Sequence, residues 1–132
     1  MIGHKRMGIL RITIAVALAT AMLGATPAFA NDADVIRRGS CSGASDWKLK
    51  LSPEDGKIEV EYEVDQNRNG QQWRVRIVKN GNVIFRGTRT TQAPSGSFEL
   101  RVVTANTSGT DTFNARATNV NSGEVCRGSA SF

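Results

Sequence analysis

Residues 111–119 read DTFNARATN, and this stretch decides the fold class. Phe113, Ala115 and Ala117 alternate with polar side chains, which is the period of two typical of a β-strand with one buried and one solvent-facing side. Similar alternating segments recur between turn signals from residue 47 to the end of the chain, and no helical period occurs after residue 30. The sequence therefore predicts an all-β protein built from short strands.

The start of the chain has the features of an export signal. Basic residues are followed by an apolar run over residues 12–23, and Ala28 and Ala30 then occupy the two positions that a signal peptidase reads. A run of this length is too short to cross a bilayer, which needs about 20 residues; a short membrane anchor or a buried helix is the alternative. We expect residues 1–30 to be a cleaved signal peptide and the released protein to be secreted and extracellular, with no membrane contact after cleavage.

Charge and length limit the functional classes. Three of the 17 Lys and Arg residues lie before Asn31 and none of the 12 Asp and Glu residues do, so the formal charge of +5 falls to +2 after cleavage. A nearly neutral protein lacks the general basicity that attracts nucleic acid. The remaining chain has the size of one domain.

The two cysteines, Cys41 and Cys126, lie near the two ends of this domain. An even number of cysteines in an exported protein predicts a disulfide. Two free thiols or a metal pair are the alternatives. The only His of the chain precedes residue 31, so a zinc site would lack ligands there and we expect no metal and no cofactor.

Turn signals divide the rest of the chain into seven or eight segments. Residues 31–45 form an N-terminal segment in which Val35 and Ile36 start a first edge strand, and residues 46–132 form the main domain. Pro53 is expected to end the strand that begins near Trp47. The expected apolar series on one side of their strands are Trp47, Leu49 and Leu51; Ile58, Val60, Tyr62 and Val64; Trp73, Val75 and Ile77; Phe98, Leu100 and Val102; and Cys126, Ala130 and Phe132. The strand that returns after Asn80 and Gly81 carries Val83, Ile84 and Phe85.

This order of segments resembles an immunoglobulin or fibronectin type III β-sandwich, in which seven or eight antiparallel strands form two packed sheets. Trp73 occupies the place of the buried Trp of that fold. Phe113 replaces its corner Tyr, and Val60 and Ala115 occupy the positions of its inter-sheet cysteines. The chain also resembles a group of short, uncharacterised secreted proteins of actinobacteria, recognisable by VDQNRNG at residues 64–70 followed by Trp73. That resemblance implies no particular activity.

Catalytic groups are scarce. Without a His after residue 30, the Ser-His-Asp and Cys-His nucleophile systems are excluded from the released protein. Glu59, Glu61 and Glu63 share one face of a strand at separations of roughly 6 to 7 Å, a range that suits an inverting glycosidase. A solvated charge ladder opposite Lys48 and Lys50 is the favoured explanation, because the row lies on an outer face and not in a cleft, and we expect no enzyme.

Two further motifs admit a functional and a structural interpretation. Asp65, Asn67, Asn69 and Gly70 match the start of a calcium-binding loop, but Arg76 stands where the bidentate Glu is needed, so an Asx-rich turn is the alternative. Trp47, Trp73 and Tyr62 would suit a carbohydrate platform, but all three fall on the apolar side of their strands and are expected in the core.

The arginines give the most usable clue to function. Immunoglobulin-like topology would place Arg74, Arg76, Arg116 and Arg127 on one sheet with few acids, and most other strand charges on the opposite sheet. Such a face could bind an anionic cell-wall polymer or an extracellular protein through bidentate contacts. Ordinary solubilising surface charge is the alternative.

Three functions are thus compatible with the sequence. The leading hypothesis is a secreted, non-enzymatic binding domain that uses the arginine face. The alternatives are a secreted protease inhibitor that uses residues 90–95 as its exposed loop, and a calcium-binding extracellular β-sandwich.

Overall fold

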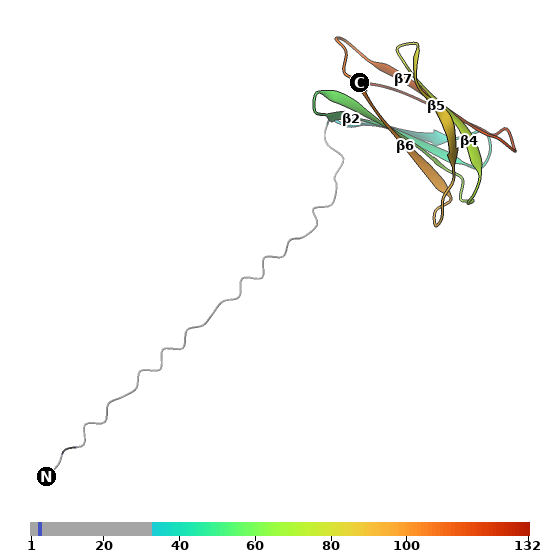
Figure 1. Ribbon diagram of the computed structural model, residues 1–132, viewed down its shortest axis with the longest axis horizontal. Coiled ribbons are helices and arrows are strands. Elements are labelled where there is room, and N and C mark those ends of the chain that lie inside the picture. The colour runs from blue at the N-terminus through green and yellow to red at the C-terminus, as the bar shows by residue number, and fades with distance from the viewer. Residues whose placement is uncertain (1–2, 4–32) are drawn as a thin grey trace.

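The computed structural model describes Gly3 and residues 33–132, and it confirms the all-β prediction (Figure 1). The expected signal peptide, residues 1–30, lies outside the described residues apart from Gly3. No helix of the described part is long and apolar enough to cross a membrane. The strands of residues 33–132 are β1 (Val35–Ser40), β2 (Asp46–Glu54), β3 (Lys57–Asp65), β4 (Gln72–Lys79), β5 (Asn82–Thr90), β6 (Ser97–Ala105), β7 (Thr112–Asn119) and β8 (Val125–Ser131).

The strands form two packed sheets of four strands each, with the orders β1-β2-β3-β6 and β5-β4-β7-β8. Every neighbouring pair is antiparallel. The expected first edge strand is β1, which pairs with β2 along its whole length and so belongs to the same sandwich. The two sheets approach each other at one side through contacts of β8 with β1 and β2.

The core lies between the sheets because one side of each central strand is apolar. In β3 the four alternate apolar side chains from Ile58 to Val64 are fully buried, and the glutamates between them are not. In β7, Phe113, Ala115 and Ala117 are buried as expected. The small alanines leave room for larger side chains of the opposite sheet, in keeping with the close packing of protein interiors.

Two tight turns fix the register of their hairpins. Asp55 and Gly56 have φ values of 47° and 75°, and Asn80 and Gly81 have 49° and 83°. Two successive positive φ values are those of the type I′ turn, whose twist matches that of paired strands. Pro53 does not end its strand, contrary to expectation. β1 pairs with β2 only as far as Leu51, so Pro53 has a neighbouring strand on one side only and its missing N–H need not interrupt a ladder.

Several contacts far apart in sequence join the two sheets. The predicted disulfide between Cys41 and Cys126 is present, linking the end of β1 to β8 across a sequence separation of 85 residues. The buried Tyr62 hydroxyl of β3 donates a hydrogen bond of 3.0 Å to the carbonyl oxygen of Cys126. At the same end of the sandwich, the Glu124 carboxylate accepts hydrogen bonds from the backbone N–H groups of Gly43 and Ser45 and from the Ser45 hydroxyl.

The opposite end of the sandwich is held by a buried carboxylate. Asp111 is fully buried and accepts hydrogen bonds from the backbone and hydroxyl of Thr107 and from the Asn80 amide. Lys79 is also nearly buried, lies 3.9 Å from Asp111 and donates to the Ala105 carbonyl oxygen. The hydrogen bonds from Thr107 lower the pKa of Asp111 more than its burial raises it.

Candidate functional site

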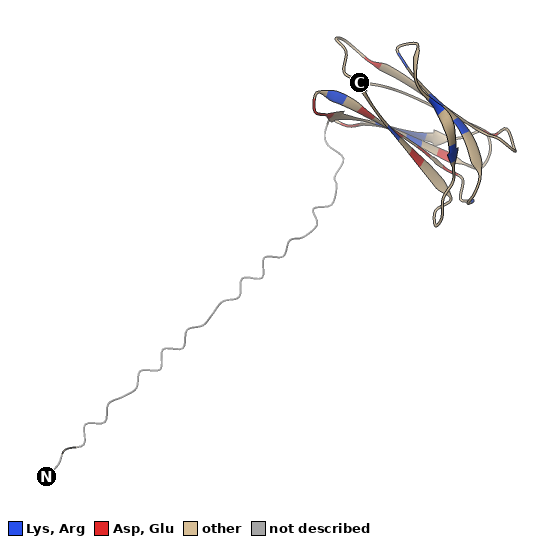
Figure 2. Ribbon diagram, viewed as in Figure 1, with Lys and Arg blue, Asp and Glu red and all other residues tan. Residues whose placement is uncertain are grey.

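The β5-β4-β7-β8 sheet contains no Asp or Glu in any of its strands. In Figure 2, β4 and β5 carry blue segments and no red ones. Because side chains alternate along a strand, the arginines that flank buried residues on β4, β7 and β8 point to the outer, solvent-facing side of this sheet. The basic residues of the four strands are Arg74, Arg76, Lys79, Arg86, Arg89, Arg116 and Arg127.

Four of these arginines occupy one line across the sheet. Arg76 of β4 pairs in register with Arg86 of β5 on one side and with Arg116 of β7 on the other, and Arg116 pairs with Arg127 of β8. Directly paired residues of antiparallel strands point to the same face. We call Arg86, Arg76, Arg116 and Arg127 the arginine row. Neighbouring strands lie about 4.8 Å apart, so the row extends over about 14 Å at right angles to the strands.

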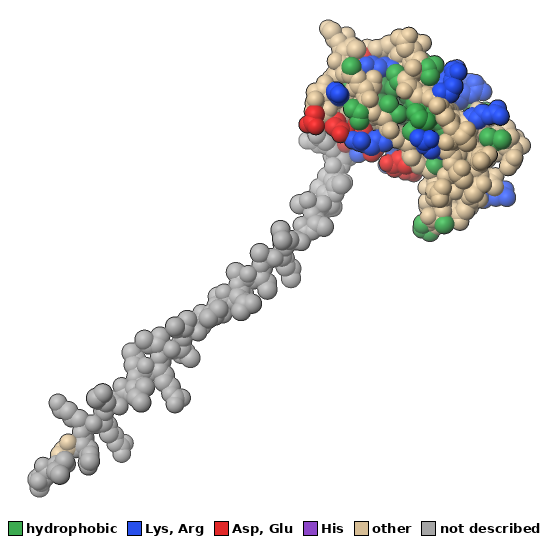
Figure 3. Space-filling model, viewed as in Figure 1, with side chains coloured by type: hydrophobic (Ala, Val, Ile, Leu, Met, Phe, Trp, Pro, Cys, Tyr) green, Lys and Arg blue, Asp and Glu red, His purple; other side chains and the backbone are tan. Residues whose placement is uncertain are grey.

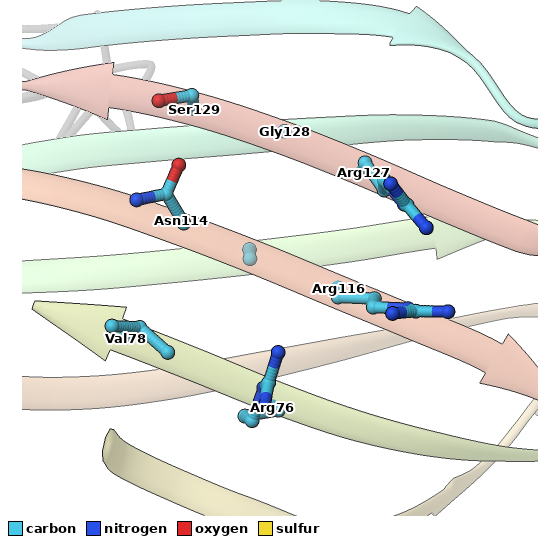
Figure 4. Close-up of a pocket in the computed structure, with 8 residues that line it drawn as sticks. Arg76, Val78, Asn114, Arg116, Arg127, Gly128 and Ser129 are labelled. Carbon is cyan, nitrogen blue, oxygen red and sulfur yellow. The ribbon is translucent and has the colours of Figure 1, made fainter. Parts of the chain in front are cut away.

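The side chains of the row are exposed and lie beside one another. Figure 4 shows Arg76, Arg116 and Arg127 leaving three neighbouring strands over a common surface. All four members of the row are exposed, and no salt bridge within residues 33–132 includes any of them. The row thus holds four guanidinium groups without a protein carboxylate to neutralise them.

The structure places all four predicted arginines on one face, but their arrangement differs in part from the prediction. Arg76, Arg116 and Arg127 are in the row. Arg74 lies on the same face, two residues before Arg76 on β4, where it pairs with Thr88 and Thr118. Arg86 was not predicted. Its place in the row depends on a β-bulge between Ile77 and Val78, which shifts the pairing of β5 so that Arg86 faces Arg76.

Shallow depressions lie on both sides of the arginine row and share Arg76 and Arg116 as walls. One has a volume of about 300 Å³ and continues past Asn114 and Ser129. The other has a volume of about 380 Å³ and is lined by Arg74, Arg86, Thr88 and Thr118 as well. Charged groups therefore stand next to neutral hydrogen-bonding groups over the centre of this face.

The outer face of the β1-β2-β3-β6 sheet has a different electrostatic character, because it carries both signs of charge and many of its charges form ion pairs. Lys48 lies 3.8 Å from Glu63, and Lys50 lies 3.8 Å from Glu61. Arg101 of β6 contacts both Glu54 and Glu59, at 2.5 and 2.8 Å. In Figure 3, by contrast, the Lys and Arg side chains at the upper right of the folded part have no Asp or Glu beside them.

The three glutamates of β3 form the expected ladder opposite the lysines of β2. The hydrogen bond from Arg101 lowers the pKa of Glu59 to about 2. Desolvation, followed by the neighbouring carboxylates of Glu59 and Glu99, raises the pKa of Glu61. A glycosidase needs two carboxyl groups facing each other across a cleft, whereas these carboxylates lie side by side along one strand of a sheet's outer face.

The suggested calcium loop has the geometry of an Asx turn. The backbone N–H of Asn67 donates to the Asp65 carboxylate at 3.0 Å, and Asn67 has a φ of 55°. Gln66 points into the sandwich, where its side-chain oxygen accepts a hydrogen bond from the indole of Trp73. Within the described part of the chain, no group of three or more His, Cys, Asp or Glu residues could hold a metal ion.

The suggested inhibitor loop closes on itself. Gln92 pairs with Ser97, and the backbone N–H of Gly96 donates to the Gln92 carbonyl oxygen. Thr91 is buried, and its hydroxyl donates to the Arg68 carbonyl oxygen in the neighbouring loop. Residues 92–95 are exposed, as an inhibitor loop requires, but they form a tight turn and not an extended segment.

The large aromatic residues pack in or beside the core and do not form a flat exposed platform. Trp73 and Tyr62 are fully buried, as predicted. Trp47 is only half-buried and packs at the margin of the core, between Gly39 of β1 and Gly128 of β8. A Cβ atom at either glycine would overlap the indole, so both glycines are needed to admit this side chain.

The arrangement on the arginine face suits the contact of several anionic groups at once, since each guanidinium presents a planar fork of donors to an oxyanion. Searches against protein-family models, curated proteins and solved structures find no match to this chain.

Proposed function

We propose that this protein is a secreted, non-enzymatic binding domain that contacts an anionic extracellular polymer, such as one attached to a cell wall, through the arginine row. The observation that carries the proposal is the alignment of four exposed arginines across a sheet whose strands contain no Asp or Glu; none of the four forms an ion pair within residues 33–132.

The stability cost of this arrangement supports a binding role over simple solubilisation. Like charges directly opposite each other in a sheet are destabilising, by roughly 0.2 to 1 kcal/mol for each pair. The row contains three such pairs in succession. Surface charge that serves only solubility does so best when both signs are interspersed, as they are on the other sheet. A bound polyanion would relieve the repulsion within the row.

We further infer that the sandwich is of the immunoglobulin-like class. In the order β5-β4-β7-β8, β4 takes the place of the strand that carries the buried Trp in that fold, and it lies between its hairpin partner β5 and the last two strands. The strands β2, β3 and β6 then correspond to the facing sheet. β1 then adds a further edge strand beside β2.

Secretion is part of the same proposal. It is supported by the export signal expected in residues 1–30 and by the Cys41–Cys126 disulfide, since such bonds persist in oxidising compartments. It also accords with the resemblance to short secreted proteins of actinobacteria. The absence of His after residue 30 supports a non-enzymatic role.

Retention of the purified protein on isolated cell walls at low salt tests the proposed function. We expect the protein to be retained on walls that carry their anionic polymers and not on walls from which these polymers have been removed. The double variant Arg74→Glu plus Arg116→Glu should lose retention. The matched control, Arg38→Glu plus Lys57→Glu, changes the charge equally on exposed residues of the other sheet and should be retained like the original protein.

Unchanged retention of Arg74→Glu plus Arg116→Glu would overturn the proposal. Equal loss with both double variants would show that only net charge matters, and it would also overturn the role of this face.

A further inference from the structure

The arginine row differs from a general basic patch because it has a direction and a length. Its four positions follow the pairing register across all four strands of the sheet, so they form a line perpendicular to the strands. A small anion on this surface meets one or two guanidinium groups. An unbranched chain of anionic groups lying along the line meets all four over about 14 Å.

The row also has neutral hydrogen-bond donors beside it. Thr88 follows Arg86 on the outer face of β5, Asn114 and Thr118 flank Arg116 on β7, and Ser129 follows Arg127 on β8. Thr88, Asn114 and Ser129 are exposed. None of these four side chains makes a hydrogen bond to another part of the described chain, so their donors are available to a ligand on this face.

This combination of donors distinguishes between classes of anion. A carboxylate and a phosphate within a linear chain each have two charged oxygens. The carboxylate is planar and its lone pairs lie in that plane, so a guanidinium fork and any further donor must approach within the same plane. The phosphate is tetrahedral, so its two unbridged oxygens can accept from a guanidinium fork and also from a hydroxyl or amide that approaches from another direction. Arginines with hydroxyl and amide donors two residues away on the same face therefore suit a phosphate better than a carboxylate.

From these observations we propose that the arginine row binds an unbranched, phosphate-containing polymer that lies across the strands, with its phosphates over the guanidinium groups and the flanking Thr, Asn and Ser side chains donating to the same unbridged oxygens from the side. This inference rests on the proposed function and specifies the ligand class, its direction and the length of chain that the site contacts.

Titration of the purified protein with linear inorganic phosphates of increasing length tests whether a chain binds along the row and how much of its length the row contacts. Affinity should rise from orthophosphate through pyrophosphate and tripolyphosphate until the chain spans the row, and should then level off. The logarithm of the binding constant should fall with the logarithm of salt concentration with a slope of about −3, since roughly 0.7 counterions are released per contact on a single-stranded polyanion. Equal affinity for orthophosphate and long chains would overturn the inference.

Single substitutions test whether binding depends on the arginine row more than on the other basic residues of the same face. Arg116→Gln and Arg127→Gln should each weaken binding of a long polyphosphate roughly three- to tenfold and reduce the salt slope by about 0.7. Arg74→Gln, on the same face but outside the row, should have a smaller effect, and Arg38→Gln on the other sheet should have none. An effect of Arg74→Gln equal to that of Arg127→Gln would contradict binding along the row.

Comparison with poly-glutamate of similar length tests the phosphate preference. We expect polyphosphate to bind at least several-fold more tightly than poly-glutamate. Thr118→Val should reduce this difference in affinity, because it should weaken the binding of polyphosphate alone. Equal affinity for the two polymers would overturn the ligand class. The polyphosphate measurements are independent of the cell-wall experiment. If the protein is retained on cell walls but shows no preference for polyphosphate, the proposed function stands and only the assignment of a phosphate chain is overturned.

Discussion

The indole of Trp47 on β2 occupies the space that a side chain at position 128 of β8 would need. Gly128→Ala is therefore expected to lower the free energy of unfolding by about 1 to 3 kcal/mol, because the added methyl group must displace the benzene ring of the indole or the β8 backbone. Chemical denaturation of the variant gives this value.

A second substitution at the same contact tests whether the Trp47 indole is the cause of this destabilisation. In a Trp47→Leu background the ring is absent, so Gly128→Ala should cost much less and the two changes should show a favourable coupling energy in a double-mutant cycle. Additive effects would show that the glycine is needed for another reason.

Tyr62 is the only tyrosine of the chain, so its ionisation can be followed directly by ultraviolet absorbance. Burial raises the pKa of its hydroxyl. The folded state therefore keeps the proton at a pH at which the unfolded state releases it. The stabilising contribution is complete below the ordinary tyrosine pKa of about 10 and is lost as the pH rises above it.

Two results are expected from this linkage. Tyrosinate should appear together with loss of the folded circular dichroism signal, not before it. Tyr62→Phe should remove most of the alkaline decline in stability while costing about 0.5 to 1.5 kcal/mol at neutral pH, because the Cys126 carbonyl oxygen loses its hydrogen bond. Titration of Tyr62 near pH 10 in the intact fold would contradict its burial.

The Cys41–Cys126 disulfide closes a loop of most of the folded chain, with a sequence separation of 85 residues. Loop-entropy arguments give a contribution of about 4 to 5 kcal/mol for a loop of this length. Cys41→Ala plus Cys126→Ala should thus strongly lower the denaturation midpoint, and reduction of the original protein should have a similar effect. A loss below about 1 kcal/mol would show that β1 and β8 are held by packing alone.

Sequence patterns alone locate most of the core but not the arrangement of the site. In β3 and β7 the burial follows the alternation of the sequence, since one face of each strand packs on the other sheet. Trp47 lies on the apolar side of β2 and is nevertheless half-buried, because its burial depends on β1 and β8 at the margin of the sandwich.

The site is harder to predict because it depends on pairing between strands. The face shared by Arg76, Arg116 and Arg127 follows from alternation within each strand. Their alignment in one line requires the order and register of the strands, and the inclusion of Arg86 requires a bulge that no single residue marks. The contacts of Glu124 with the loop at Gly43 and Ser45 depend likewise on tertiary structure, as the partners lie 79 to 81 residues apart.

Arg116 lies in the centre of the row, directly between Arg76 and Arg127, so it has a like charge on either side. Arg116→Thr is therefore expected to raise the free energy of unfolding by about 0.5 to 1 kcal/mol at low salt, because it removes two repulsive cross-strand pairs and introduces a residue that favours strands. The gain should shrink as salt screens the exposed charges, whose interactions decay over about 10 Å at 0.1 M ionic strength. Arg101→Thr, on the outer face of the other sheet, provides the comparison: its cross-strand partner is Glu61 and it forms ion pairs with Glu54 and Glu59, so its removal should lower stability at low salt. Denaturation curves at low and high salt measure both variants.

If polyanion binding is the reason for the row, the Arg116→Thr variant is more stable than the original protein and binds polyphosphate more weakly. A loss of stability at low salt would show that the arginines do not repel one another in the folded protein.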